Sequence, residues 1–254
     1  MNLQHLCSLG VIVLIALCTA CCDAEDPAED FLLETPPTAL EPEAPTTPQC
    51  HEYVDLCLPS GTLWATCNIG ASKPEESGLF FAWGETRGYT SDDNEKLPFD
   101  WVNYKWCNGS EKTMTKYCTN SRYGNVDNLS LLEPADDAAH VAWGDQWRMP
   151  TSNDFRELLK HTDHIWLNLE NAKGFLFTSH INGNALFLPA TGHRISDLYC
   201  DDNSIHYWAS TLFNQDQSHA SCLYLFIRLG MEYSNDYDKR IYGLPIRPVR
   251  LKEQ

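Results

Sequence analysis

Residues 143–159 contain the clearest helix start in the chain, and that start limits how the segments around it can fold. Thr151 is a good N-cap because its hydroxyl can accept a hydrogen bond from an N–H of the first helical turn. Asp154, three residues later, completes a short capping box at the positive end of the helix. Three apolar residues then fall on one helical face, which must pack against another element. They are Phe155, Leu158 and Leu159.

The chain around this helix reads as short strands separated by turn residues. Asn182-Gly183 is the strongest hairpin signal. Residues 222–229 are apolar on both faces, which predicts a central strand. Pro245 and Pro248 predict that the last strand is irregular or lies at a sheet edge. The expected strands span residues 53–58, 62–69, 79–83, 174–179, 184–188, 206–211, 222–229 and 244–251.

Residues 86–130 are polar and rich in Asn, Ser, Thr, Asp and Tyr, which predicts a long irregular region. Long ordered loops are often functional. A short helix is expected over residues 135–141, with Asp136 and Asp137 near its start. The fold class expected from these patterns is α+β, with short antiparallel strands, one or two helices and long loops.

Residues 1–20 are typical of an export signal. Residues 6–20 are apolar apart from Ser8 and Thr19, and this run is too short to span a bilayer comfortably. No Lys or Arg precedes the run, so only the terminal amine supplies positive charge. The alternative is a buried strand or helix of a cytosolic domain. The polar sequence that follows favours the export signal.

The signal ends in Leu17-Cys-Thr-Ala-Cys-Cys-Asp23, which resembles a bacterial lipobox. In such signals the Cys after the cleavage point carries a lipid, and Cys21 is the predicted lipidation site. Cys22 is the alternative, because Cys18 stands where the motif usually has Leu. The acids that follow resemble the tag that sends lipoproteins of the Bacteroides group to the cell surface. The predicted location is therefore the outer membrane, with a lipid anchor and a surface-exposed domain.

Residues 21–49 predict a tether between the anchor and a domain at residues 50–254. Positions 22–49 hold eight acids, six prolines and no Lys or Arg, so they lack the apolar surface that folding needs. The whole chain has a net charge of −17. Nucleic acids and anionic membrane surfaces attract basic proteins, so neither is an expected partner.

Eleven cysteines occur in the chain, but no Cys-x-x-Cys pair and no zinc-like spacing is present. An exported chain can keep disulfides. Cys107 and Cys118 flank a short loop and are one candidate pair. Cys200 and Cys222 bracket an expected strand and are another. Sequence does not determine which cysteines pair.

Six segments stand out for their aromatic, Gly and Arg-Pro content: residues 53–71, 81–86, 136–151, 187–192, 207–210 and 246–250. Together, and in this order, they resemble the Fibrobacter succinogenes major paralogous domain, which is common in surface lipoproteins of gut bacteria. The resemblance covers about residues 53–250. Cys57 stands where the family usually has Gly, which favours an extra disulfide at that turn.

The resemblance implies a fold distantly similar to C-type lectins and to formylglycine-generating enzymes. The segments Arg148-Met-Pro-Thr151 and Arg247-Pro-Val-Arg250 carry that likeness. Formylglycine-generating enzymes use a closely spaced Cys pair late in the chain. Cys200 and Cys222 lie far apart, so that activity is not expected here.

Aromatic side chains suggest both a core and a ligand surface. Five tryptophans lie in the family-like segments and are expected to fill the core rather than to stack on sugars. They are Trp64, Trp83, Trp143, Trp147 and Trp208. Three aromatic residues in the polar region are the candidate ligand contacts. They are Trp101, Tyr104 and Trp106.

Metal sites are weaker possibilities, and no cofactor is expected. Four residues before the helix combine carboxylates with a histidine, although such groups more often cap helices and pair with neighbours such as Arg148. They are Asp136, Asp137, His140 and Asp145. His161 and His164 would share a helical face if the helix continued that far. Asp201-Asp202-Asn203 and Asp236-Tyr237-Asp238 are expected loop tips without calcium-loop spacing.

No catalytic motif of the common hydrolase, zinc-protease or phosphate-loop types is present. The predicted function is therefore a non-catalytic binding or display domain on the cell surface, with a glycan or a protein as ligand. One alternative is an envelope enzyme acting on glycans, which needs two carboxylates facing one cleft. The other is a subunit of a surface fibre or complex, which needs an exposed apolar patch or a donated strand.

Overall fold

The computed structural model describes residues 52–90, 97–170, 172–196, 198–200, 203–228 and 231–252. The chain divides into two units, Met1–Glu43 and Ala44–Gln254, and all described residues belong to the second unit. The expected signal, the tether and Cys21 lie outside the described residues. None of the helices in the described part of the chain is both long and apolar enough to cross a bilayer.

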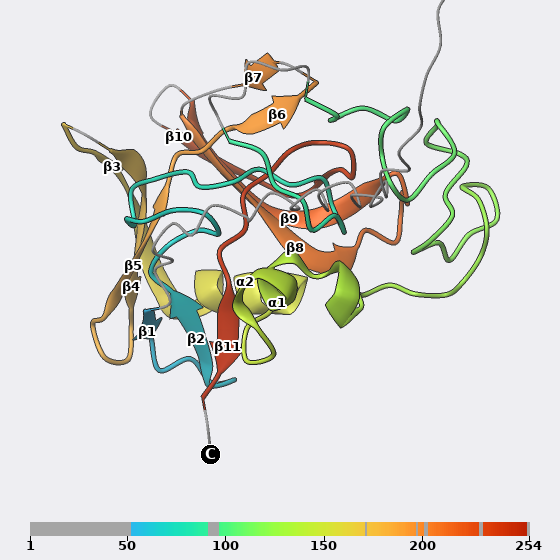
Figure 1. Ribbon diagram of the computed structural model, residues 1–254. Coiled ribbons are helices and arrows are strands. Elements are labelled where there is room, and N and C mark those ends of the chain that lie inside the picture. Colours follow the sequence, from blue (N-terminus) through green and yellow to red (C-terminus); the bar gives the residue numbers. More distant parts are fainter. Residues whose placement is uncertain are drawn as a thin grey trace, which may run out of the picture. The chain divides into compact units, whose positions relative to one another are not determined.

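Short antiparallel strands dominate the domain, as predicted, and helices are few (Figure 1). The strands form three three-stranded sheets, with orders β1-β2-β11, β10-β9-β8 and β3-β4-β5, and one two-stranded sheet, β6-β7. The α+β class is therefore confirmed. The bounds are β1 Tyr53–Asp55, β2 Thr62–Ala65, η1 Pro134–Asp136, α1 Ala138–Trp143, α2 Ser152–His161, β3 Thr162–Asn168, β4 Lys173–Ser179, β5 Ala185–Pro189, β6 His193–Ile195, β7 Leu198–Cys200, β8 Ser204–Leu212, β9 His219–Arg228, β10 Met231–Lys239 and β11 Val249–Leu251.

Helix α2 begins where the sequence predicts. The Thr151 side chain accepts a hydrogen bond from Asp154 N, and the Asp154 side chain accepts one from Thr151 N at 2.7 Å, which completes the capping box. Phe155 and Leu158 are buried, and Leu159 packs against the same cluster. This face contacts β8, β9, β3 and β4, so α2 joins two of the sheets.

Strand β9 is the central strand of its sheet, as the apolar pattern of residues 222–229 predicts. Its neighbour β10 was not predicted, because residues 231–239 are polar and charged. Asp236 and Asp238 lie within β10, so their predicted place at a loop tip is wrong. Residues 201 and 202 lie outside the described residues.

Helix α2 ends at His161, and β3 follows without a loop. Thr162 at the junction has an extended backbone (φ −132°, ψ 149°), and its hydroxyl donates to the Leu158 carbonyl at 2.7 Å. His164 therefore lies in a strand, and the expectation that it shares a helical face with His161 is wrong. The Asn182-Gly183 turn does connect β4 and β5, as predicted.

The last strand, β11, lies at the edge of its sheet, as the prolines predict, but it is shorter than expected. It pairs with β2, which also pairs with β1. The buried Arg247 supports this sheet, because its guanidinium donates to the Ala65 carbonyl at 3.1 Å and the Thr66 carbonyl at 2.7 Å.

Two further expected elements differ from the prediction. Residues 79–83 form only isolated bridges, Phe80 with Tyr89 and Phe81 with Leu244, because their two neighbours come from unrelated parts of the chain. The helix expected over residues 135–141 is divided at Asp137 into η1 and α1. Asp137 has an extended backbone (φ −90°, ψ 108°), which ends one helix and caps the next.

The five tryptophans of the family-like segments are core residues, as predicted. Trp64 packs with α2 and the β4, β5, β8 and β9 side chains. Trp83, Trp143, Trp147 and Trp208 belong to a second cluster beside α1. A third cluster lies under the long polar region and includes Phe99, Tyr104 and Met114.

The cysteines of the predicted Cys107–Cys118 pair are free thiols in the structure. Each hydrogen-bonds a carbonyl instead: Cys107 with Trp101 at 3.1 Å and Cys118 with Asn120 at 3.2 Å. Cys222 is also a buried free thiol, so the predicted pair with Cys200 is not formed.

Cys57 forms no extra disulfide either, and its exposed thiol lies 3.1 Å from the Asn182 side-chain nitrogen. Its backbone is left-handed, with φ of 51°. Glycine adopts that conformation most readily, so the structure explains why glycine suits this position.

Candidate functional site

The long polar region is irregular, as predicted, and a buried arginine holds it in place. Arg240 donates from Nε to the Tyr104 hydroxyl at 2.9 Å and from its terminal nitrogens to three carbonyls. These carbonyls belong to Lys116, Tyr117 and Gln217, at 3.1, 3.2 and 3.3 Å. A planar guanidinium can satisfy several acceptors at once, so one side chain fixes the loop against the start of β9.

Two further side chains fix the same loop through its backbone N–H groups. The Gln217 side-chain oxygen accepts from Thr119 N at 2.8 Å and from Asn120 N at 3.1 Å. The Asp127 carboxylate accepts from Tyr117 N at 2.7 Å and from Cys118 N at 2.9 Å. Burial opposes the charge of Asp127, but these backbone donors outweigh it and lower its pKa.

A polar pocket of about 420 Å³ lies between this loop and the turn that connects β8 and β9. Four lining residues come from the loop and two from the turn. They are Glu111, Lys112, Arg122, Tyr123, Asp216 and Ser218. The pocket thus combines carboxylates, cations, a hydroxyl and a phenol.

Asp216 is already engaged by its own turn. One carboxylate oxygen accepts from Ser218 N at 3.0 Å and from the Ser218 hydroxyl at 2.6 Å. The other lies 3.4 Å from His219 Nδ1. Burial opposes ionisation, but the Ser218 donors and His219 outweigh it, so the pKa of Asp216 is lowered. Asp216 is therefore a carboxylate at neutral pH.

Ser218, His219 and Asp216 have the residue types of a hydrolytic triad but not its geometry. The Ser218 hydroxyl and the Asp216 carboxylate both approach His219 Nδ1, at 2.9 and 3.4 Å. A triad histidine holds the carboxylate with one ring nitrogen and the serine with the other. The arrangement here stabilises a turn and does not activate Ser218 as a nucleophile.

Tyr123 is the aromatic group of the pocket. Partial burial raises its pKa, and the negative charges of Asp216 and Glu111 raise it further, while Arg122 opposes them. A neutral phenol beside carboxylates can donate one hydrogen bond and offer a ring face to a ligand.

The three aromatic residues predicted as ligand contacts have different environments. Tyr104 is only 2% exposed, and its hydroxyl donates to the Trp83 carbonyl at 2.7 Å, so its predicted ligand contact is wrong in this structure. Trp101 is half-buried, with its ring against Tyr104 at 5.9 Å. Trp106 donates to the Gly84 carbonyl at 2.7 Å, and the Lys105 ammonium lies 4.2 Å from its ring centre.

The acidic cluster before α2 serves the fold. Asp136 is buried and pairs with Lys116 at 2.6 Å, while the Tyr117 hydroxyl donates to the same carboxylate oxygen at 2.6 Å. Asp137 caps α1 and also accepts from Met149 N. Burial raises the pKa of Asp137 despite these donors. Within the described ranges, no three His, Cys, Asp or Glu side chains form a group that could hold a metal ion.

The other two members of that cluster lie at the surface. His140 Nε2 is 3.5 Å from the Asp145 carboxylate, and Asp145 is almost fully exposed. Arg148, named as a possible partner of the cluster, instead pairs with Asp154 at 2.8 Å. The four residues therefore do not converge on one point.

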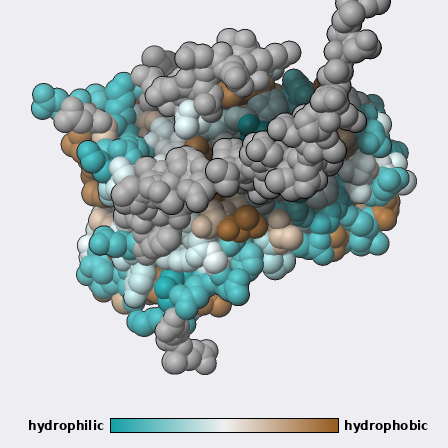
Figure 2. Space-filling view, viewed as in Figure 1, coloured by the Kyte–Doolittle hydropathy of each residue, from teal (hydrophilic) through white to brown (hydrophobic). Residues whose placement is uncertain are grey.

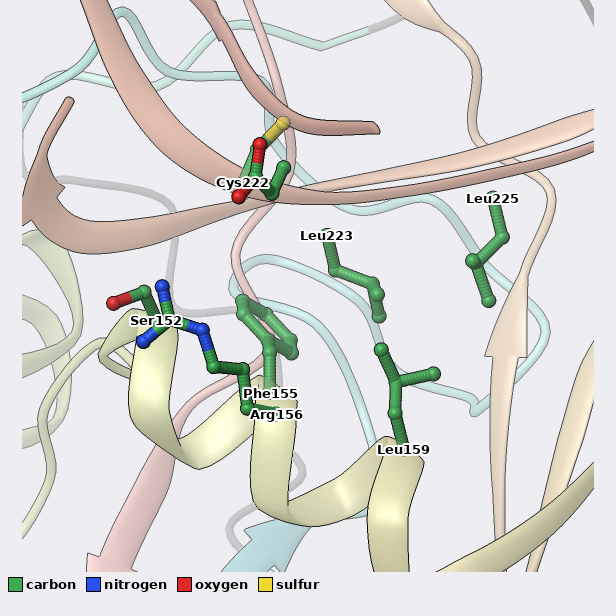
Figure 3. Close-up of a pocket in the computed structure, with 8 residues that line it drawn as sticks. Ser152, Phe155, Arg156, Leu159, Cys222, Leu223 and Leu225 are labelled. Atoms are coloured by element: carbon green, nitrogen blue, oxygen red, sulfur yellow. The ribbon is translucent and has the colours of Figure 1, made fainter. Parts of the chain in front are cut away.

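A second hollow, of about 310 Å³, lies between α2 and strands β9 and β10. In Figure 3, Phe155 and Leu159 from the helix point towards Leu223 and Leu225 from the strand. Arg156 reaches towards Ser152 at one end. Phe155, Leu223 and Leu225 also belong to the core, so this hollow is a place where the core approaches the surface. It offers fewer specific polar contacts than the pocket beside Tyr123.

Comparisons with protein-family models, with curated proteins and with solved structures gave no match. The pocket residues were not singled out from the sequence, apart from the general expectation for a long polar loop. Four of the six lining residues lie in that loop. Asp216 and Ser218 lie far along the chain from the loop, and the Gln217 and Arg240 contacts help to bring them to it.

Proposed function

We propose that this chain is a surface lipoprotein whose domain binds a glycan without catalysis, in the polar pocket lined by Tyr123. The observation that supports this best is that charged and hydroxyl side chains line the pocket together with one aromatic ring, beside a loop that Arg240 and Asp127 hold by hydrogen bonds. Sugars present hydroxyl groups and apolar ring faces. A pocket with fixed polar groups and one aromatic ring matches both.

The fixed backbone of the loop beside the pocket supports a binding function. A loop that is ordered before the ligand arrives loses little conformational entropy on binding. Arg240, Gln217 and Asp127 supply that order from beneath the pocket, without belonging to its lining. Of the lining side chains, Asp216 and Ser218 are held by their own turn and offer fixed polar atoms.

Catalysis by the same pocket is the competing hypothesis, because Glu111 and Asp216 both line it. Glycoside hydrolysis requires one carboxyl group with a raised pKa and a second carboxylate across the scissile bond. Asp216 has a lowered pKa and is held by Ser218 and His219. That environment suits a fixed hydrogen-bond acceptor better than a proton donor.

The proposal includes lipid anchoring at Cys21, with the acidic segment as a tether. Its support is the sequence alone: an apolar run, a small residue before Cys21 and acids after it. Replacing Cys21 and Cys22 together by Ser should release the protein from the membrane fraction. Retention of the double variant in that fraction contradicts lipid anchoring.

Glycan binding is tested with the Ala44–Gln254 unit on a broad glycan array, first with calcium and then with a chelator. We expect selective binding to a small set of glycans. Loss of binding after chelation identifies a calcium-dependent site. Absence of binding to any glycan on the array contradicts glycan binding. Release of sugar from a bound glycan supports the enzyme hypothesis.

The pocket is tested by Tyr123→Ala, with Tyr53→Ala as the matched control at an exposed tyrosine outside it. Loss of one stacking ring should weaken binding about tenfold. Tyr53→Ala should leave the affinity unchanged. Equal effects of the two variants place the glycan elsewhere on the domain.

A further inference from the structure

The outward face of the β3-β4-β5 sheet carries a row of apolar side chains. Ile165 pairs with Leu176, and Leu176 pairs with Phe187, so three apolar residues lie side by side across three strands. The opposite face carries Phe175 and Phe177, which are fully buried in the core. Because side chains alternate along a strand, the row cannot also reach that core.

Exposure confirms that the row faces outward. Ile165 is 56% exposed and Leu169, just beyond the end of β3, is 55% exposed. Leu176 and Phe187 are half-buried, since each is flanked by its neighbours on the sheet. In Figure 2 the left margin, where Figure 1 places β3, shows brown hydrophobic residues between teal ones. Contiguous apolar surface of this kind marks interaction sites.

A glycine extends the row towards the hairpin end. A Cβ atom at Gly174 would lie 2.9 Å from Phe187 Cζ and 2.2 Å from the Leu188 carbonyl oxygen, so the Phe187 ring covers the Gly174 backbone. Beside it lies a hollow of about 340 Å³. Its lining residues are Glu75, Leu169, Glu170, Ala172 and Phe187. The row therefore ends in a concave site with an apolar floor.

Strand β3 is also an edge strand, paired on one side with β4. Edge strands are commonly kept from pairing with other chains by prolines, lysines, bulges or short length. Strand β3 has seven residues, contains no Pro or Lys, and pairs with β4 without a register shift. Among the described strands the other edges differ. β1, β6, β7 and β11 have three residues each, β5 ends in Pro189, and β8 and β10 carry register shifts.

The charges around this surface are acidic. Both charged residues that line the hollow, Glu75 and Glu170, are carboxylates. Asp163, on the same face of β3, is highly exposed, and His180 lies 3.1 Å from it. A partner with basic residues at the ends of an apolar segment complements this arrangement.

We propose that the β3 edge and the outward row are a docking surface for an extended segment of another protein, apolar in its middle and basic at its ends. The segment adds as a fourth strand beside β3, so its backbone pairs with the edge that faces away from β4. Its apolar side chains continue the Ile165–Leu176–Phe187 row. Its basic residues face Glu75, Glu170 and Asp163. This surface is separate from the Tyr123 pocket, so either proposal can fail alone.

The test uses the full chain, purified in detergent, and a dye-labelled peptide Lys-Val-Thr-Val-Thr-Val-Lys. The control peptide Glu-Val-Thr-Val-Thr-Val-Glu keeps the apolar pattern and reverses the charges. We expect saturable binding of the basic peptide below about 1 mM, with slower hydrogen exchange at β3 amides. The acidic peptide should bind about tenfold more weakly. Absence of saturable binding, or equal binding of the two peptides, overturns the proposal.

Substitutions at two isoleucines of nearly equal exposure test where the peptide binds. Ile165→Ser removes an apolar contact from the row, and Ile181→Ser removes one at 57% exposure in the β4–β5 turn. The first should weaken peptide binding about tenfold, and the second should change it less than twofold. If Ile165→Ser does not fold, Leu169→Ser replaces it. Equal weakening by the row and turn variants overturns the assignment.

A second copy of this chain is the competing occupant. Sedimentation of the unmodified chain at increasing concentration shows whether it dimerises. A dimer that Ile165→Ser dissociates, and Ile181→Ser does not, assigns the surface to self-association and overturns the proposal of a different partner. A monomer that binds the basic peptide supports the proposal.

Discussion

The long polar loop and the β3-β4-β5 sheet differ in how their backbones are held in place. The loop has almost no regular structure, yet Arg240, Gln217 and Asp127 satisfy its backbone from within. The sheet is regular over seven paired residues, yet one edge and one apolar face remain open. A segment can therefore have its backbone hydrogen bonds satisfied without regular secondary structure, and a regular sheet can leave one edge and one face open. The irregular region is the more internally satisfied of the two.

Removing the loop's central anchor should have the largest effect. Arg240→Met eliminates four hydrogen bonds and leaves buried carbonyls without donors. We expect a loss of about 4 kcal/mol in the free energy of unfolding, measured by urea denaturation. Arg122→Met, on the exposed surface of the same loop, is the matched control and should change stability by less than about 0.5 kcal/mol. Similar losses in both variants contradict the anchoring role.

Substitutions on the two faces of the β3-β4-β5 sheet should lower the free energy of unfolding by unequal amounts. Phe177→Ala opens a cavity in the core and should cost about 3 kcal/mol. Ile165→Ser, on the outward face, should change stability by less than about 0.5 kcal/mol. Urea denaturation of both variants gives the comparison. A large loss for Ile165→Ser shows that the outward row packs within the domain after all.

Helix α2, which packs against the β3-β4-β5 sheet and the β10-β9-β8 sheet, depends on its cap. Thr151→Ala removes the acceptor for Asp154 N, and the expected loss is about 1 kcal/mol. Thr178→Ala, near the end of β4 and half-buried, is the control at a threonine without a capping role. Thermal unfolding of the two variants measures the difference. Equal destabilisation shows that loss of any half-buried threonine accounts for the effect.

The same cap predicts a pH effect of smaller size. Burial opposes the charge of Asp154, but Arg148 and the Thr151 donors outweigh it and lower its pKa below 3.8. A lowered pKa in the folded state contributes stability above the unfolded value, and that stability is lost as pH falls through the folded value. Unfolding measured between pH 6 and pH 2 should show the advantage of the unmodified chain over Asp154→Asn shrinking below about pH 4. A constant difference contradicts it.

Because the cysteines whose side chains the structure describes are free thiols, a reducing agent should not change the stability of the described fold. Cys107, Cys118 and Cys222 are free, so a reducing agent should leave the unfolding midpoint unchanged. A thiol reagent should modify the exposed Cys57 in the native state and the buried Cys67 only after unfolding. Loss of stability on reduction indicates that a disulfide contributes.

Local signals made part of the fold predictable. The Thr151 cap, the Asn182-Gly183 turn and the prolines before β11 each act on neighbouring residues, and all three predictions were confirmed. Strands β3, β6, β7 and β10 were missed because their pairing partners, and not their own composition, determine them. β3 directly follows a helix, and β10 is mostly polar.

The polar pocket was less predictable for the same reason. Its residues are ordinary turn and loop residues until Arg240 brings the loop to the turn before β9. A buried arginine whose partners are carbonyls leaves no charge pattern in the sequence. Tyr104 was misassigned because a polar stretch of sequence does not reveal which of its aromatic rings points inward.

Strand β11 pairs with β2, so the sheet that begins the domain is completed only by residues near its end. During synthesis, the hairpin formed by β1 and β2 has to wait for almost the whole domain to be made. Contacts between distant residues form slowly, because a long loop must close first. The nascent chain consequently stays incomplete until its last strand is available. Removing β11 should leave a product that proteases degrade rather than a slightly shortened, folded domain.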